Sequence, residues 1–133
     1  MSPDAAGLIG RAAALLGDPT ARADAPAVAR ALGATLDNRA EGTGFLGSDP
    51  VSGCYAVDVA CRGDLVDSVV LRLDTPVPLA DLVAGLGPYE KVTPVAGHRR
   101  LDAVEFRPPG VQLVARLDES RGAAIEVLIH PVP

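Results

Sequence analysis

Acidic residues and arginines alternate on one side of the segments that are expected to form a sheet. Counted in steps of two along each segment, the residues on this side are Asp58, Arg62, Ser68, Arg72, Glu105, Arg107, Gln112, Arg116, Asp118, Glu126 and His130. Successive side chains of a strand point to opposite faces, so we expect these residues to share one face of the sheet. Arginine binds carboxylates through two parallel hydrogen bonds, and a carboxylate in a water-poor pocket can act as an acid or a base.

Three interpretations of this face follow. It could be an ordinary solvated face with cross-strand salt bridges, a protein-binding surface, or a catalytic cleft. In the cleft, Asp58, Glu105 or Glu126 would act as acid or base, and Arg72 or Arg116 would hold an anion. Only a few apolar residues share this face, too few to enclose a pocket: Val66, Val70, Val114 and Leu128.

We therefore favour a non-catalytic protein-binding module, such as an inhibitor, immunity or accessory factor. The expected partner-binding residues are Asp58, Arg62, Arg72, Glu105, Arg107, Arg116, Glu126 and His130. The alternative is a small cofactor-free biosynthetic enzyme, a cyclase or isomerase, with its carboxylate on the same face. A third hypothesis is self-association through a strand edge or the polar face, so a homo-oligomer stays open.

Other motifs add no chemistry. Residues 42–47 match G-x-G-x-x-G, but the sequence predicts no strand before them and Asp49-Pro50 excludes the helix that dinucleotide binding needs. Arg62-Gly63-Asp64 is expected to be a hairpin turn. The two histidines, His98 and His130, would need Glu105 or Glu126 beside them to bind a metal, as in the glyoxalase-like superfamily. We expect no metal and no cofactor.

Helical spacing of apolar residues predicts three helices. The first begins at Ser2-Pro3-Asp4, buries Leu8, Ile9, Ala12, Leu15 and Leu16, and ends at Gly17. The second covers residues 26–32 and would form a helical hairpin with the first. The third covers residues 78–86. Residues 37–53 are polar and rich in glycine, and we expect a long loop there.

Period-two alternation predicts strands over residues 54–62, 65–73, 101–107, 111–118 and 123–130. The residues expected to face the core are Tyr55, Val57, Val59, Cys61, Leu65, Val69, Leu71, Leu73, Val111, Leu113, Ala115, Leu117, Ala123, Ile125, Val127 and Ile129. Pro76 and Pro78 are expected to end the second strand. The predicted fold is α+β: a single domain, 1–133, with the helices on one face of an antiparallel sheet of five to six strands. Residues 24–76 and 77–130 could be internal repeats.

Composition excludes several classes of protein. The 133 residues are 48% hydrophobic and 22% charged, which is typical of a folded globular chain. The net charge of −5 argues against nucleic-acid binding, and no apolar run is long enough for a membrane span. No export signal is recognisable, so we expect a cytoplasmic protein. Cys54 and Cys61 should be too far apart on one strand for a disulfide, which predicts two free thiols.

The C-terminal half resembles a known module. The features that carry the resemblance are Leu86-Gly87-Pro88, the Pro109-Gly110 turn and Leu117-Asp118 before Arg121-Gly122. They are similar to the module of the SmpA/OmlA-type outer-membrane assembly lipoproteins and of beta-lactamase inhibitor protein, mainly over residues 78–130. The resemblance implies a helical hairpin on an antiparallel sheet and a protein-binding function without catalysis. Since the chain begins without a lipoprotein signal or its lipidated cysteine, a membrane-assembly role is not expected.

Overall fold

The computed structural model describes residues 4–20, 28, 32, 36–40, 43–46, 54–62, 65–91, 103–120 and 122–132. The helices are α1 (Asp4–Leu16) and α3 (Leu79–Leu86). The strands are β1 (Leu36–Ala40), β2 (Thr43–Leu46), β3 (Cys54–Arg62), β4 (Leu65–Pro78), β5 (Tyr89–Lys91), β6 (Ala103–Phe106), β7 (Val111–Leu117) and β8 (Ala123–Pro131). The predictions for Ser2-Pro3 and His98 lie outside the described residues.

The strands form one antiparallel sheet in the order β1-β2-β3-β4-β8-β7-β6-β5. Each half of the chain contributes four consecutive strands, and the halves meet where β4 pairs with β8. The five predicted strands are all present, and the α+β class is confirmed. Over the described residues the sheet has eight strands, three more than the five predicted, and the additional ones are the short strands β1, β2 and β5.

The predicted loop over residues 37–53 is wrong where β1 and β2 lie. These two strands pair with each other, and β2 pairs with β3. They have only 5 and 4 residues, and Asp37, Asn38 and Gly44 interrupt any hydrophobic alternation. β5 is equally short, and the ring of Tyr89 packs on that of Phe106 with centroids 5.6 Å apart.

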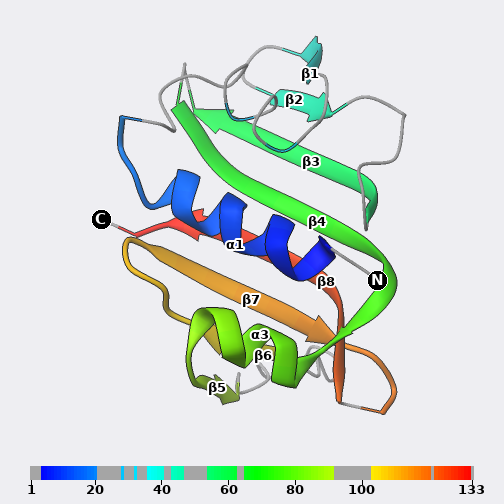
Figure 1. Cartoon of the computed structure of the whole chain (residues 1–133). Helices are drawn as coiled ribbons and strands as arrows, with labels where there is room; N and C mark the ends of the chain where they lie inside the picture. The colour runs from blue at the N-terminus through cyan, green and yellow to red at the C-terminus, as the bar shows by residue number, and fades with distance from the viewer. Residues whose placement is uncertain are drawn as a thin grey trace, which may run out of the picture.

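Both helices lie on the same face of the sheet, which we name the inner face (Figure 1). Helix α1 crosses β4, β8 and β7, and α3 packs beside it. The apolar stripe predicted for α1 is buried at Leu8, Ile9, Ala12 and Leu16. Among the described residues, all of those that are fully buried are apolar. No described helix has the length and apolar character needed to cross a membrane.

The second predicted helix is described only at Val28 and Leu32. Both residues are buried in the core, and the Leu32 N–H donates to the Val28 carbonyl at 3.0 Å. This i to i+4 bond is what a helical turn makes. The rest of residues 26–32 lies outside the described residues, so the helical hairpin remains a prediction, as does the internal repeat.

Bulges change which side chains face the core. The β3–β4 register shifts twice, and the β7–β8 register shifts between Arg116 and Leu117. A bulge places an extra residue in one strand and reverses the alternation beyond it. Val66 is therefore buried where alternation places it outward, and Ala124 is buried in place of Ala123 and Ile125. Cys54 is likewise buried.

Strand β4 continues through the two prolines that were expected to end it. In the pairing of β4 with β8, Arg72 lies opposite Glu126 and Val77 lies opposite Ala124. Residues 73–76 of β4 therefore correspond to a single residue of β8, Ile125. Pro76 lies within this irregularity, where no ladder hydrogen bond is required of its missing N–H, and Pro78 is the last residue of β4, opposite Ala123. The irregularity lets β4 bend toward α3, as Figure 1 shows.

Candidate functional site

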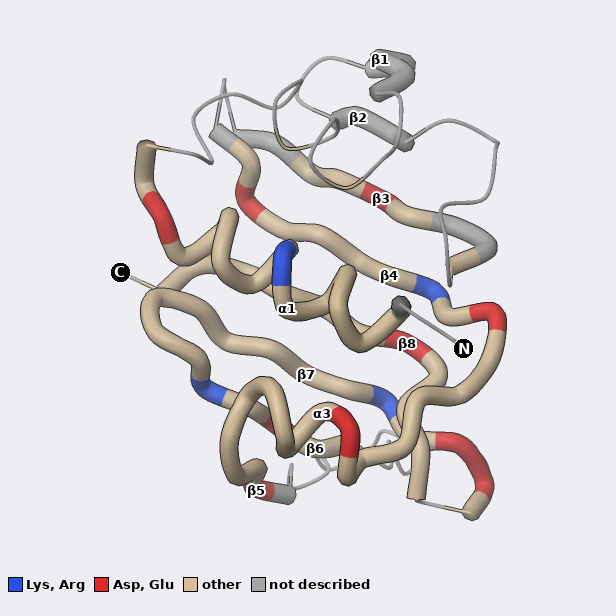
Figure 2. The backbone as a smooth tube through the Cα atoms, in the orientation of Figure 1, with Lys and Arg blue, Asp and Glu red and all other residues tan. Residues whose placement is uncertain are grey.

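The sheet surface opposite α1 and α3, which we name the outer face, holds the predicted site residues that the structure describes. Its members are Asp58, Val70, Arg72, Glu105, Arg107, Gln112, Val114, Arg116, Glu126, Leu128 and His130. Figure 2 shows basic and acidic positions distributed over the neighbouring strands β3, β4, β7 and β8, whereas each helix carries few charges. The side chain of Arg62 lies outside the described residues, so its predicted role stays a prediction.

An aliphatic row crosses the centre of the outer face. Cα register places Val70 beside Leu128 and Leu128 beside Val114, on strands β4, β8 and β7. All three side chains are half-buried. The row is flanked by Asp58, the register partner of Val70, and Glu105, the partner of Val114. It is therefore a narrow apolar band with an acidic residue at each end.

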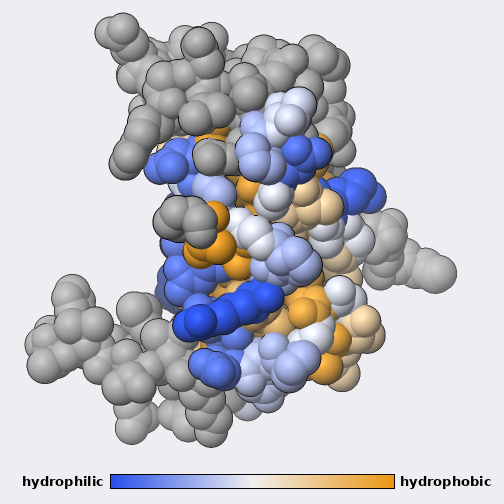
Figure 3. All heavy atoms as spheres, turned by 90° about the vertical axis from the view of Figure 1, so that its left-hand side faces the viewer, coloured by the Kyte–Doolittle hydropathy of each residue, from blue (hydrophilic) through white to orange (hydrophobic). Residues whose placement is uncertain are grey.

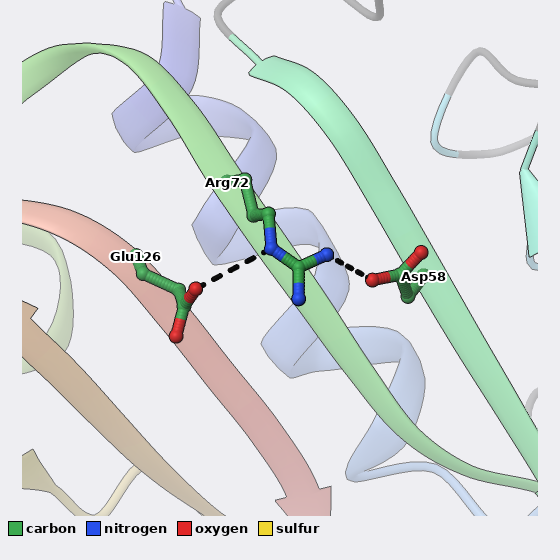
Figure 4. A network of polar contacts seen from close by, with 3 residues as sticks. All are labelled: Asp58, Arg72 and Glu126. Carbon is green, nitrogen blue, oxygen red and sulfur yellow. Dashed lines mark hydrogen bonds and ion pairs between the residues drawn. The ribbon is translucent and has the colours of Figure 1, made fainter. Parts of the chain in front are cut away.

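Arg72 bonds carboxylates on both neighbouring strands. Its guanidinium donates to Asp58 on β3, and its Nε lies 3.4 Å from Glu126 Oε2 on β8 (Figure 4). The three side chains are 37%, 33% and 29% exposed. This ionic contact spans the β4–β8 junction between the two halves of the sheet. At such exposure, each pair contributes no more than about 1 kcal/mol to stability.

Glu105 forms a second polar group on the outer face. Arg107 Nε donates to its Oε2 at 2.8 Å, and Gln112 Nε2 donates to the same oxygen at 3.0 Å. The Glu105 side chain is only 15% exposed, whereas that of Arg107 is 72% exposed. The two donors compensate the partial desolvation of the carboxylate.

Arg116 differs from the other arginines of this face. It is exposed on β7, and its register partner Glu126 is the carboxylate that Arg72 approaches. Of the outer-face arginines whose side chains the structure describes, Arg116 alone has no ionic or hydrogen-bonded partner within the chain. His130 lies opposite Gln112 by register and is half-buried.

The predicted residues thus fall into an Arg72 group, a Glu105 group and a separate Arg116. What sequence reasoning missed is the adjacency of Val70, Leu128 and Val114, which depends on strand pairing. Viewed from the side on which α1 ends, the described surface interleaves hydrophilic and hydrophobic residues (Figure 3). Ile125 was also missed because it was expected to face the core.

Cys54 is the buried thiol of β3. Burial, and secondly the negative charge of Asp74, raise the pKa of its thiol to about 11. A thiol held protonated is a poor nucleophile and a poor metal ligand. The described residues contain no group of three or more His, Cys, Asp or Glu that could hold a metal ion.

Comparisons with known proteins give one structural similarity. No family model matches the chain, and no curated protein matches it. The crystal structure of a DUF4309 family protein (YjgB) from Bacillus subtilis subsp. subtilis str. 168 is similar, with a TM-score of 0.41 and 14% sequence identity. The similarity covers 74% of this chain and 64% of that chain, so the chain spans less than two thirds of the length of that protein.

Proposed function

We propose that the protein is a non-catalytic protein-binding module that binds its partner through the outer face. The observation that carries the proposal is the aliphatic row Val70–Leu128–Val114 between the Arg72 and Glu105 groups. Protein interfaces combine a small apolar centre with a polar rim. The outer face likewise has aliphatic side chains at its centre and charged side chains around them. We include a cytoplasmic location in the proposal.

The carboxylates of the outer face support binding better than acid–base catalysis. Asp58 and Glu105 each accept a hydrogen bond from an arginine, and Glu126 lies within ion-pair distance of Arg72. Acid–base catalysis needs a carboxylate that can reach a proton of the substrate, and these carboxylates already contact arginines of the chain. The outer face therefore favours binding over a cyclase or isomerase activity.

Two matched variants, one on the outer face and one on helix α3, test the proposal. Val114→Arg places a long charged side chain in the aliphatic row, and Val83→Arg places the same side chain on α3, where Val83 is 36% exposed. Tagged wild-type protein and both variants are used to capture proteins from the lysate of the source organism, with quantitative mass spectrometry as the readout. Thermal melts establish that both variants remain folded.

The expected result is a partner that wild type and Val83→Arg capture equally and that Val114→Arg loses. Equal capture by Val114→Arg, or equal loss with both variants, contradicts the proposal. If no captured protein depends on Val114, the outer face is not the binding surface.

A further inference from the structure

Arg116 stands out because its charge is not used within the chain. Arg72 and Arg107, on the same face, each approach a carboxylate, whereas Arg116 is exposed and has no such partner among the described residues. The nearest candidate by register, Glu126, directs Oε2 to Arg72 at 3.4 Å. An arginine in this position is available for a carboxylate from another molecule.

Apolar side chains lie beside Arg116 on the outer face. Val114 precedes it by two residues on β7, which puts the two side chains on one face about 7 Å apart. Leu128 is the register partner of Val114 and extends this apolar surface onto β8. An apolar surface beside a cation lowers the local dielectric and strengthens an ion pair formed there.

Ile125 completes the surroundings. Ala124 and Val127 are both 0% exposed, so the two residues between them, Ile125 and Glu126, turn away from the core. Ile125 has no register partner on β7, since the pairing shifts from Arg116–Glu126 to Leu117–Ala124. Bulges commonly re-aim side chains next to functional sites. Here the bulge adds a half-buried aliphatic residue beside the Arg72–Glu126–Arg116 row.

We propose that the outer face binds an acidic–aliphatic segment of the partner protein. One carboxylate of that segment bonds Arg116, and an aliphatic side chain lies on Val114 and Leu128. The carboxylate and the aliphatic side chain of the segment must then be about 7 Å apart. This is the distance between residues i and i+2 of an extended segment. This inference rests on the proposed function and names the chemistry of the partner.

A random peptide library displayed on phage is the probe that tests it. Peptides are selected on immobilised wild-type protein, and the selected sequences are then measured by fluorescence polarisation. We expect Asp or Glu two positions from Leu, Ile or Val. The net charge of −5 gives the protein no general attraction for acidic peptides, so their enrichment reports a local site.

Three arginine variants serve as the test, the control and an intermediate case. Arg116→Gln should weaken binding about tenfold or more, because a charge-assisted hydrogen bond is lost. Arg11→Gln should weaken it less than about twofold, since Arg11 is exposed on α1, on the opposite side of the sheet from the outer face. Arg116→Lys should lie between them, because lysine keeps the charge but not the two-point geometry.

The outcomes separate this inference from the proposed function. Peptides that lack an acidic residue, or that bind Arg116→Gln as tightly as wild type, overturn the inference. So does a selection that enriches no peptide. Peptides that lose binding to Val114→Arg but keep binding to Arg116→Gln overturn it while supporting the outer face as a binding surface.

Discussion

The inner face of the sheet buries only apolar side chains among the described residues, whereas the outer face sets charged side chains beside aliphatic ones. Phe106 and Leu128 illustrate the contrast. Phe106 on β6 is fully buried beneath the helical layer, and Leu128 on β8 is half-buried at the centre of the outer face. Neighbouring strands of one sheet therefore supply both the core and the candidate site.

This difference separates stability from binding. Burial of apolar surface is the main stabilising term in folding, and the inner face provides it. Half-exposed ion pairs contribute little to the free energy of unfolding. The charged side chains of the outer face can therefore contact a partner protein without a large loss of stability. Substitutions on the two faces should therefore act on different measurable quantities.

The largest expected effect comes from comparing Phe106→Ala with Leu128→Ala. Removing the buried ring should lower the free energy of unfolding by about 3–5 kcal/mol. Truncating Leu128 should lower it by roughly 1 kcal/mol, since part of its surface is already in contact with water. Urea denaturation followed by circular dichroism measures both, and Phe106→Leu replaces Phe106→Ala if that variant does not fold. Equal losses would mean that the outer face is packed like a core.

Alternation in the sequence predicts most of the inner face and fails at particular residues. Val111, Leu113 and Ala115 were predicted to face the core, and all three are buried. Val66 and Ile125 were assigned to the wrong face because bulges lie beside them. A bulge is an irregularity in the pairing of two strands. The apolar periodicity of one strand therefore does not reveal it.

The close packing of the inner layer extends to backbone at the end of α1. A Cβ added to Gly17 would lie 2.6 Å from the carbonyl oxygen of Pro109. Gly17→Ala should therefore force the β6–β7 turn away and cost about 1–3 kcal/mol. Gly10, with nothing within 4 Å of its added Cβ, is the control. Gly10→Ala should raise stability by about 0.5–1 kcal/mol, because alanine favours the helix.

Thermal and urea unfolding of both glycine variants measure these effects. A neutral Gly17→Ala would show that the contact between α1 and the turn is loose. In that case the inner layer would be less tightly packed than its burial indicates.

Cys54 gives the inner face a dependence on pH. The pKa of its thiol is about 11 in the folded protein, against 9.0 for an unperturbed thiol. A raised folded pKa gives stability that is fully present below pH 9 and declines as pH rises toward 11, because only the unfolded chain loses the proton there. The slope in that window should approach about 1.4 kcal/mol per pH unit.

Urea unfolding between pH 8 and pH 11 measures this slope, with Cys54→Ala as the control. The variant keeps every other titrating group, so the difference between the two proteins isolates Cys54. Identical slopes would place the thiol in contact with water.

The candidate site was less predictable than the core. The alternation placed Arg72, Glu105 and Arg116 on one face, and the structure agrees. Which carboxylate each arginine meets depends on register, and register follows from pairings and bulges that one sequence does not display. The sequence alone therefore does not show that Arg116 lacks, among the described residues, the carboxylate contacts that Arg72 and Arg107 make.

The smallest expected effect is that of Arg72→Gln on the outer face. Loss of its guanidinium leaves Asp58 and Glu126 without their shared cation and should cost about 1 kcal/mol at low salt. Because salt screens half-exposed charges, this cost should shrink in about 1 M NaCl, whereas the cost of Phe106→Ala should not. A double-mutant cycle with Glu126→Gln isolates the Arg72–Glu126 pair, for which we expect a few tenths of a kcal/mol. A coupling above about 2 kcal/mol that persists in salt would make Arg72 a structural residue of the β4–β8 junction. The outer face would then contribute to the stability of the fold as the inner face does.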